Sequence, residues 1–517
     1  MRRAGVGGLA GQGEAGERGA SRDASRDASR DTSRDASRDA APRWRPGRRP
    51  PAVAAVSLGC PKNRVDTEVM LAALAVSGFC VTADPDDADV LLVNTCAFID
   101  AASDESLSAL RRAVARRGAA ARPVVVAAGC LVERRGAAIM ADVPGLGGAL
   151  GTGRVGSVVD VVRAAVAGEE PVVAGRPGHL PRHAPPRLLT TPRHYAYLKI
   201  AEGCANRCHY CLIPSLRGDL KSRPLAAVGA EAAQLLAAGA REIVLVAQDT
   251  TRWGLDLGGA PRLADLVRRL GGLLGLEWLR VMYAHPARVS ADLLAALAGS
   301  PAACRYLDVP LQHASPRVLR AMGRGGGGSD EFLRLLERVR DALPGVALRT
   351  TFLAGFPGED EGDVRELEAF VAAAGFDHAG VFAFSPQPGT PAAGLAGQVP
   401  AAVAAERAAR IYRAQRAAAL AAARRRLGTR LRAVVEGTAG RSVAPPDCAG
   451  GEDCGAGSAC PRARAAGGRW VAGRAVTQAP EVDGRSYLFG APKTPGTFVD
   501  ATVAGCGPYH LCAIVDA

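Results

Sequence analysis

The sequence predicts an α/β protein with an N-terminal parallel sheet, a central partial (β/α) barrel and a small C-terminal β-barrel. Three observations support this class. The chain of 517 residues is longer than one ordinary domain of roughly 100 to 200 residues. Its hydrophobic content of 48% is enough to build a large core. Strand-like apolar runs also alternate with helical stretches over most of the chain, as in proteins whose parallel sheets are covered by helices.

The composition indicates a protein of a reducing compartment that uses its cysteines chemically. The chain has 13 cysteines and no apolar leader run, and in that setting thiols serve metals or redox chemistry rather than disulfides. No run approaches the roughly 20 apolar residues of a membrane span, so we expect a cytoplasmic protein with no membrane partner. The net charge of +13 comes mostly from arginine, which supplies all but four of the 64 basic residues. Because this bias extends over the whole chain, the charge alone does not indicate a nucleic-acid partner, although a polyanion such as the ribosome fits it.

Residues 1–50 are expected to form a disordered low-complexity extension. Five tandem tetrapeptides run from Ser21 to Ala40, and a Pro/Arg-rich tether follows them. Without an apolar period this segment cannot bury enough surface to offset the entropy of ordering it. A helix held by local pairs of Arg and Asp is the alternative.

Residues 51–168 predict a domain of β-α-β units in which three strands each end in a cysteine. The runs AVAAVSLGC, ADVLLVNTC and PVVVAAGC end at Cys60, Cys96 and Cys130. Helical stretches separate the runs, so the strands are expected to be parallel. Functional residues collect at the carboxyl ends of parallel strands, which predicts that the three thiols converge on one edge of the sheet.

A linker over residues 169–192 leads to a core of repeated β-α units over residues 193–428. Repeats of this length predict a complete or partial barrel with its chemistry at the carboxyl ends of the strands. A long Ala/Arg helix over about 401–427 closes the core, and residues 429–517 predict a small β-barrel-like domain. The six candidate strands of the core are YAYLKIAEGC, EIVLVAQDT, LRVMYAHP, YLDVPLQH, LRTTFLAGFP and HAGVFAFSP.

A second group of three cysteines stands in the stretch LKIAEGCANRCHYCLIPSLRG, at C-x3-C-x2-C spacing. Cysteine thiolates hold iron–sulfur clusters, and a cubane with three protein thiolates leaves one iron open to a small molecule. A structural zinc site needs a fourth ligand, and His209 lies inside the motif, where it is poorly placed to reach the same ion. An iron–sulfur cluster is therefore favoured over zinc at Cys204, Cys208 and Cys211.

Rare residues mark the same stretches. The chain has three asparagines, Asn63, Asn94 and Asn206, and each lies within three positions of one of the six cysteines named above. Three of the four lysines, Lys62, Lys199 and Lys221, lie in or near the same stretches. In a chain poor in both residue types, these positions indicate sites where substitution is not tolerated.

The C-x3-C-x2-C spacing, with the aromatic Tyr210 before its last cysteine, resembles the signature of the radical S-adenosylmethionine superfamily. In that superfamily the open iron binds the amino and carboxylate groups of S-adenosylmethionine. An electron from the cluster then yields an adenosyl radical that abstracts hydrogen. Candidate contacts to S-adenosylmethionine, at predicted strand ends that face the site, are Tyr210, Gln248, Asp249, Gly355 and Gly358.

Two three-cysteine groups followed by a small β domain resemble the methylthiotransferases, which insert sulfur into an unactivated C–H bond and add a methyl group. The resemblance covers nearly all of residues 51–517 and implies a TRAM-like C-terminal domain. It implies two 4Fe-4S clusters and two molecules of S-adenosylmethionine, one for the radical and one for the methyl group. The implied ligands are Cys204, Cys208 and Cys211 for the radical-generating cluster, and Cys60, Cys96 and Cys130 for an auxiliary cluster that carries sulfur.

Segments such as SLGCPKNRVDTEVM, YLDVPLQHASPRVLRAMGR and APEVDG resemble the branch of this family that acts on an aspartate of small-subunit ribosomal protein S-twelve. That branch implies this protein as partner in a ribosomal context, together with an electron donor and a sulfur donor. The branch that modifies isopentenyladenosine in transfer RNA is the alternative. Residues 429–517 carry nine basic and eight acidic side chains, and an RNA-binding module usually shows a basic face. From another class, a non-catalytic iron–sulfur or RNA-binding protein is the alternative.

Other conspicuous residues receive structural interpretations. Apolar surroundings predict buried, inert thiols at Cys80 and Cys304, and Cys506 and Cys512 are expected to pack inside the β domain. The run MGRGGGGSD lacks the Lys-Ser/Thr ending of a phosphate loop and predicts a flexible connection. At strand ends, His285 and His313 have either a polar role at the site or a hydrogen-bonded structural one. An inserted loop over about 442–468 holds Cys448, Cys454 and Cys460, for which a metal role is the lesser alternative.

Overall fold

The structure is a computed structural model that describes most of the chain after residue 48. The described ranges are 49–116, 122–175, 180–259, 261–325, 327–437, 470–492 and 494–516. The predicted N-terminal repeats and the insertion with Cys448, Cys454 and Cys460 lie outside the described residues. No helix in the described part of the chain is long and apolar enough to span a membrane.

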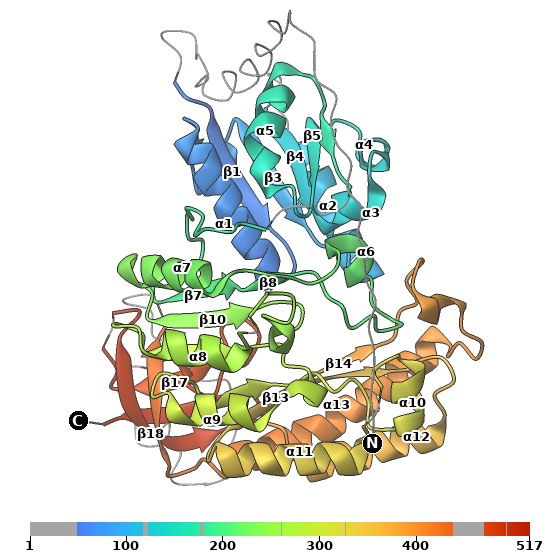
Figure 1. The fold of residues 1–517 in the computed structure, drawn as a ribbon, viewed down its shortest axis with the longest axis vertical. Helices are drawn as coiled ribbons and strands as arrows, with labels where there is room; N and C mark the ends of the chain where they lie inside the picture. The colour runs from blue at the N-terminus through green and yellow to red at the C-terminus, as the bar shows by residue number, and fades with distance from the viewer. Residues whose placement is uncertain are drawn as a thin grey trace, which may run out of the picture. The chain divides into compact units, whose positions relative to one another are not determined.

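The N-terminal part of the described chain alternates strands and helices. They are β1 (Ala52–Ser57), α1 (Pro61–Val76), β2 (Cys80–Val81), β3 (Val90–Thr95), α2 (Asp100–Ala115), β4 (Val124–Gly129), α3 (Cys130–Arg135), α4 (Ala138–Asp142), β5 (Gly148–Gly151), α5 (Val158–Ala167) and β6 (Val172–Val173). The strands form one parallel sheet in the order β2-β1-β3-β4-β5-β6. Every side chain of β3 is buried, as expected for a strand covered on both faces. Helix α2 packs on one face of the sheet, and α1 and α5 lie side by side (Figure 1).

The central part contains all six predicted core strands, separated by helices. They are β7 (Tyr195–Lys199), α7 (Leu225–Ala237), β10 (Glu242–Val246), α8 (Leu263–Gly271), β11 (Trp278–Val281), α9 (Ala291–Gly299), β12 (Tyr306–Asp308), α10 (Pro316–Ala321), α11 (Ser329–Ala342), β13 (Ala347–Ala354), α12 (Glu361–Ala374), β14 (His378–Ala383) and α13 (Ala401–Arg424). Between β7 and α7 lie the short strands β8 (Ala201–Glu202) and β9 (Lys221–Ser222) and the helix α6 (Ile213–Arg217). The parallel sheets β7-β10-β11 and β12-β13-β14 lie next to each other: Ala284 N, just after β11, donates to Asp308 O of β12 at 2.9 Å. The result is a partial (β/α) barrel.

Helix boundaries and faces follow from the local sequence. Helix α12 begins after Asp360, whose carboxylate accepts a hydrogen bond from the backbone N–H of Asp363, and the carboxylate of Asp363 accepts one in return. This capping box satisfies two donors that have no partner inside the helix. Helix α11 buries Phe332, Leu335, Leu336 and Val339, which is the spacing of a single apolar face.

The C-terminal part closes into the predicted small barrel. Its strands are β15 (Arg430–Val435), β16 (Trp470–Ala475), β17 (Ser486–Phe489), β18 (Phe498–Cys506) and β19 (Leu511–Val515), paired in the order β15-β16-β17-β19-β18. Cys506 and Cys512 are buried in it, and Cys304 is buried in the core, as the sequence predicts. The prediction for Cys80 is wrong. That residue lies in β2, a two-residue edge strand, where its side chain is exposed.

The segment Val476–Asp483, between β16 and β17, packs against the core strands on the face away from their helices. Alternate side chains of β7, β10 and β11 pack under the core helices, whereas Tyr197, Val244 and Trp278 of the other face cluster with Ala479. A period of two along a strand separates these two sets. The hydroxyl of Tyr197 donates to Pro480 O at 3.2 Å. The C-terminal barrel therefore covers the inner face of the partial barrel with one of its own connections.

Asp483 anchors this segment. Its carboxylate accepts hydrogen bonds from the Tyr306 hydroxyl at 2.8 Å and from Arg349 Nε at 3.3 Å, and it lies near His378. Burial opposes ionisation, but His378, Arg349 and the hydrogen-bond donors outweigh it and lower the pKa of Asp483. Because the folded pKa lies below the unfolded value of about 3.9, this stabilisation is present at neutral pH and is lost as pH falls through the folded pKa.

The substitution Asp483→Asn is expected to lower the free energy of unfolding by about 3 kcal/mol at pH 7, because it removes one of the two carboxylates that pair with Arg349, leaving only Asp308, and weakens the hydrogen bond from the Tyr306 hydroxyl. Chemical denaturation measures the loss, and the deficit should shrink as pH falls below about 4. Asp292→Asn is the control, because this carboxyl is 58% exposed and surface pairs contribute at most about 1 kcal/mol. Equal losses for the two variants would contradict the anchoring role.

Candidate active site

Cys60, Cys96 and Cys130 follow three neighbouring strands of the N-terminal sheet. Cys60 precedes α1, Cys96 follows β3, and Cys130 begins α3 directly after β4. The strand order β1-β3-β4 places these three ends side by side. A Cβ built at Gly59 would lie 2.9 Å from Cys96 Sγ, and Gly59 has a φ of +83°, so only glycine allows this approach. We call these three cysteines the N-terminal triad.

The thiols of the N-terminal triad influence one another. Burial raises the pKa of Cys130 to about 12, and negative charge on Cys60 and Cys96 adds to the rise. Burial also raises the pKa of Cys96. At Cys60 burial acts in the same direction, but the positive charges of Lys62 and Arg217 and nearby backbone N–H groups outweigh it and lower the pKa. The three thiols therefore belong to one electrostatic environment.

Two of the three asparagines fix the loops of this triad. Asn63 Nδ2 donates to Leu58 O at 3.0 Å and to Thr95 O at 2.9 Å, which ties the residues before Cys60 and Cys96 together. Asn94 Nδ2 donates to Asn63 O at 2.8 Å. The short amide side chain bridges two backbone segments here. This role explains why asparagine occupies these positions in a chain that has only three asparagines.

Cys204, Cys208 and Cys211 form a second group, the core triad, in the loop after β8. Burial raises the pKa of Cys211 to about 12, and the charges of Cys208 and Cys204 add to the rise. Asn206, within this loop, donates from Nδ2 to Asp249 Oδ2 at 2.7 Å. The loop is thereby tied to the carboxyl end of β10.

Arg324 is a neighbour of the core triad that sequence reasoning missed. Its Nη1 lies 3.9 Å from Cys208 Sγ and 3.3 Å from the Tyr210 hydroxyl, and its Nη2 donates to Pro310 O at 2.7 Å. It belongs to the run MGRGGGGSD, which the sequence predicts only as a flexible connection. No signal in that run distinguishes Arg324 from the many other arginines of the chain.

A buried charged cluster connects the N-terminal triad with the two segments that flank the core triad in the sequence, β8 and α6. Arg217, at the end of α6, donates to Glu202 Oε1 at 2.8 Å, to Asp66 Oδ2 at 3.4 Å and to Cys130 Sγ at 3.5 Å. It also donates to Asn63 Oδ1. Lys199 donates to Asp66 and, at 2.7 Å, to Glu202. We call Asp66, Lys199, Glu202 and Arg217 the bridging network.

Electrostatic interactions favour the charged forms of Lys199, Glu202 and Arg217 in the bridging network. Burial opposes the charge of Glu202, but Arg217 and Lys199 lower its pKa far below the ordinary range. Burial likewise opposes the charge of Lys199, yet Asp66 and Glu202 raise its pKa. Two cations and two anions therefore balance one another where the N-terminal part meets the core.

The five candidate S-adenosylmethionine contacts occupy different surroundings. Gln248 Nε2 donates to Glu202 Oε1 at 2.8 Å, while its buried Oε1 has no hydrogen-bond partner among the described residues. Asp249 is held by Asn206, Thr251 and, at 2.5 Å, Arg288. An unpaired buried carbonyl needs a partner, so Gln248 is the candidate with capacity to bind a ligand.

The two candidate glycines have local reasons for being glycine. Gly355 follows β13 with a φ of +78°, and a Cβ there would overlap the Cβ of Ala404. Gly358, with a φ of +80°, donates its backbone N–H to Gly397 O at 2.8 Å. Both glycines follow a core strand, as predicted. Gly355 approaches α13, and Gly358 approaches Gly397 in the segment before α13.

The two histidines at strand ends differ. His313 is fully buried and its Nδ1 accepts a 2.9 Å hydrogen bond from Ser315 N, which is a structural role. Burial, together with the charges of Arg324 and Arg288, lowers the pKa of His285 to about 3, so its ring is neutral at physiological pH. His285 and Arg324 line a cavity of about 160 Å³.

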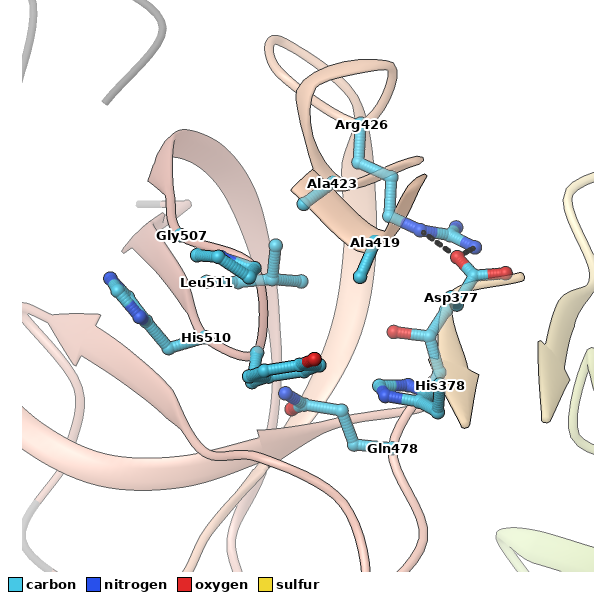
Figure 2. A pocket seen from close by; sticks show the side chains of 12 residues that line it. Asp377, His378, Ala419, Ala423, Arg426, Gln478, Gly507, His510 and Leu511 are labelled. Carbon is cyan, nitrogen blue, oxygen red and sulfur yellow. Dashed lines mark hydrogen bonds and ion pairs between the residues drawn. The ribbon is translucent and has the colours of Figure 1, made fainter. Parts of the chain in front are cut away.

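The cavity of Figure 2 lies where α13 and β14 meet the C-terminal barrel. Asp377 and Arg426 form an ion pair in it at 2.7 Å, and His378, Gln478 and His510 line it. Its volume of about 20 Å³ is close to that of one water molecule. It is therefore too small to hold a cofactor.

The donor set of the described residues fits an iron–sulfur cluster, because thiolates are the usual ligands of such clusters and each triad supplies three. No group of three or more His, Cys, Asp or Glu side chains in the described ranges is spaced to hold one ion. The three thiolates of a cubane bind three different irons, so they stand further apart than ligands of one ion. The two groups of three thiols are donors of the kind that clusters use. The unpaired Gln248 Oε1 is an acceptor for a small polar ligand.

Comparison with known proteins identifies the family. Two family models match the chain, described as uncharacterized protein family UPF0004 over residues 52–151 and as the radical SAM superfamily over residues 198–371. A ribosomal protein uS12 methylthiotransferase RimO from Desulforudis audaxviator is 45% identical, over 90% of this chain and 96% of that protein. The chain belongs to the RimO family of radical S-adenosylmethionine methylthiotransferases. The RimO of Anaeromyxobacter sp. (strain K) is 42% identical, over 89% of this chain and 92% of that protein.

Solved structures show the fold that the RimO family shares with more distant enzymes. The radical S-adenosylmethionine methyltransferase TsrM from Kitasatospora setae, with cobalamin and a 4Fe-4S cluster bound, matches with a TM-score of 0.51 and 18% identity. The match covers 66% of this chain and 77% of TsrM. The predictions of fold class, of a radical S-adenosylmethionine enzyme and of the methylthiotransferase family are confirmed.

Arg217→Met is expected to lower the free energy of unfolding by about 3–5 kcal/mol, because it leaves Asp66 and Glu202 buried with one cation between them. Chemical denaturation of the variant without cofactors measures this loss. Arg207→Met removes an arginine that is 69% exposed and pairs with Asp219, so a change of about 1 kcal/mol or less is expected. A variant at Arg217 as stable as the one at Arg207 would show that the bridging network contributes little.

Proposed function

We propose that this protein is the methylthiotransferase that modifies the β-carbon of an aspartate in ribosomal protein uS12, the small-subunit protein S-twelve. The reaction would use two 4Fe-4S clusters and two molecules of S-adenosylmethionine. The RimO name of the relatives supports the choice of uS12. The observation that carries the two-cluster assignment is that the chain has two separate cysteine triads, and that one buried network joins the N-terminal triad to the segments flanking the core triad.

The ligand assignment follows the triads. Cys204, Cys208 and Cys211 would bind the radical-generating cluster, since they occupy the loop at the carboxyl end of the first core strands. Cys60, Cys96 and Cys130 would bind the auxiliary cluster. Each triad supplies three thiolates, so each cluster would keep one iron free for a ligand other than protein.

When bound, the clusters and S-adenosylmethionine supply an electron, a hydrogen-abstracting radical, sulfur and a methyl group. The chain supplies positions and charges. Gln248 offers its unpaired carbonyl to S-adenosylmethionine, and Tyr210 and Asp249 hold the surrounding loops through Arg324 and Arg288. Gly355 and Gly358 are proposed to let the backbone approach the same ligand.

The bridging network holds the triads at a fixed separation. A substrate carbon attacked at one site must receive sulfur at the other, so relative motion of the two parts would lower the rate. Arg217 is suited to this task, because one side chain contacts Glu202 of the core, Asp66 of α1 and the thiol of Cys130.

The domain limits and remaining partners are part of the proposal. Residues 51–168 would carry the auxiliary cluster, 193–428 the radical chemistry and 429–517 the TRAM-like barrel, with 169–192 as linker. Strand β6 lies within that linker and pairs with β5, so the sheet continues past residue 168. An electron donor and a sulfur donor complete the cytoplasmic reaction.

The test is the intact mass of uS12 from cells with and without this gene, with transfer RNA nucleosides analysed from the same cultures. Loss of one methylthio group from uS12 alone is expected in cells without the gene. Reintroducing the gene should restore the mass, and Cys80→Ser should restore it too, because this thiol is exposed and lies beside Ala52 at the amino end of β1, the opposite end of that strand from Cys60. Cys208→Ala should restore nothing.

A different pattern of mass changes would overturn the substrate assignment. If the mass of uS12 is unchanged and a methylthioadenosine disappears from transfer RNA, the enzyme class stands and the aspartate assignment fails. If neither changes and the purified, reconstituted and reduced protein cleaves no S-adenosylmethionine, the non-catalytic alternative holds.

A further inference from the structure

Lys62 is a buried ammonium group beside the N-terminal triad. Lys62 is 8% exposed and lies two positions after Cys60. Its Nζ lies 3.7 Å from the centre of the Tyr283 ring. Among the ion pairs of the described residues, none joins Lys62 to an acidic side chain. Buried charges in proteins are normally paired. Among the described residues, Lys62 faces the Tyr283 ring and the thiol of Cys60 and has no carboxylate partner, so it has room for an anionic ligand.

The nearby acidic groups are already matched. Asp66 and Glu202 each contact both Lys199 and Arg217. Two anions and two cations cancel within the bridging network. Lys62 lies outside this balanced set, and the ionisable group that acts on it there besides Tyr283 and Arg217 is the thiol of Cys60. An ammonium also has three N–H donors, and the face of one aromatic ring does not occupy them all.

Tyr283 links the position of this charge to the strand ends of the core. It follows β11 with a φ of +60°, a conformation that a bulky residue adopts only when its surroundings enforce it. Its backbone N–H donates to Asp308 Oδ2 at 2.9 Å and its carbonyl accepts from Thr250 N at 3.1 Å. Thr250 follows Asp249, which holds Asn206 of the core triad loop. The ring that supports Lys62 is thus fixed by the strand ends that carry the radical site.

We propose that Lys62 binds the side-chain carboxylate of the target residue and selects an acidic residue as substrate. This inference rests on the proposed function and identifies the group that recognises the aspartate. The carboxylate carbon is bonded directly to the β-carbon, so an ammonium that binds the carboxylate beside the N-terminal triad also fixes the position of the reacting carbon. An adenine ring has no carboxylate and gains nothing from this contact. Lys62 is a positioning residue in this role.

The test compares binding of two forms of uS12, one with the target aspartate and one with asparagine in its place. Reconstituted protein is titrated with each form under anaerobic conditions, and dissociation constants are measured for the wild type, Lys62→Met, Lys62→Arg and Arg64→Met. Arg64 is the matched control, because it lies on the same helix and already pairs with Glu481 at 3.0 Å. Iron content is measured for every sample.

The wild type is expected to bind the aspartate form at least about tenfold more tightly than the asparagine form, as for a partly buried ion pair. Lys62→Met should bind both forms equally and keep its iron. Lys62→Arg should retain part of the preference, because the charge is kept. Arg64→Met should keep the full ratio.

Other outcomes overturn the proposal in distinguishable ways. If the wild type prefers aspartate and Lys62→Met keeps that preference, the proposal is wrong and the proposed function stands. If Lys62→Met loses about half of its iron and binds both forms with the wild-type ratio, the lysine serves the auxiliary cluster rather than the substrate. If the wild type binds neither form and the mass of uS12 does not depend on the gene, the proposed function fails and this inference fails with it.

Discussion

The contact on which the rest of the site depends is the buried side chain of Arg217. It starts in the core, six residues after Cys211, and ends among Asp66, Asn63 and Cys130 of the N-terminal part. A guanidinium offers five donors in a fixed plane, so it can satisfy a carboxylate, an amide oxygen and a thiol at the same time. Lysine could not reproduce this geometry. Through this one residue the loop of the core triad and the loops of the N-terminal triad are held together.

The two triads are built by the same topological rule. Parallel strands bring their carboxyl ends to one edge of a sheet, and both groups of cysteines follow such ends. The C-terminal barrel contributes from the other direction, because Val476–Asp483 packs on the inner face of the core and pairs Glu481 with Arg64 of α1. Each of the three parts therefore contacts the other two close to the site.

The sequence predicts the fold, and it singles out the two groups of cysteines, because both depend on local patterns. Strand runs ending in Cys60, Cys96 and Cys130, and the C-x3-C-x2-C motif, are visible without any structure. The rarity of asparagine also points correctly to Asn63, Asn94 and Asn206, whose amides bridge the loops. These features are encoded within short stretches of the chain.

The side chains around the triads could not be predicted in the same way. Arg217, Arg324 and Arg288 are three of many arginines, and only the folded chain shows that they approach cysteines or strand ends. Lys62 is rare enough to be noticed, yet its lack of an acidic partner depends on how Asp66 and Glu202 are used by others. Cys80 shows the opposite failure, because an apolar neighbourhood in sequence becomes an exposed edge strand. Long-range pairing decides each of these cases.

The central claim is that two cysteine triads each hold a cluster in one protein. The most direct measurement is the iron and sulfide content of anaerobically reconstituted protein, with S-adenosylmethionine cleavage assayed on the same samples. The wild type is compared with two triple variants, Cys60→Ala/Cys96→Ala/Cys130→Ala and Cys204→Ala/Cys208→Ala/Cys211→Ala. The account predicts about eight irons per chain in the wild type and about four in either variant, with cleavage retained only when the core triad is intact. A wild type with about four irons, all lost with the core triad and unchanged without the N-terminal triad, would contradict it.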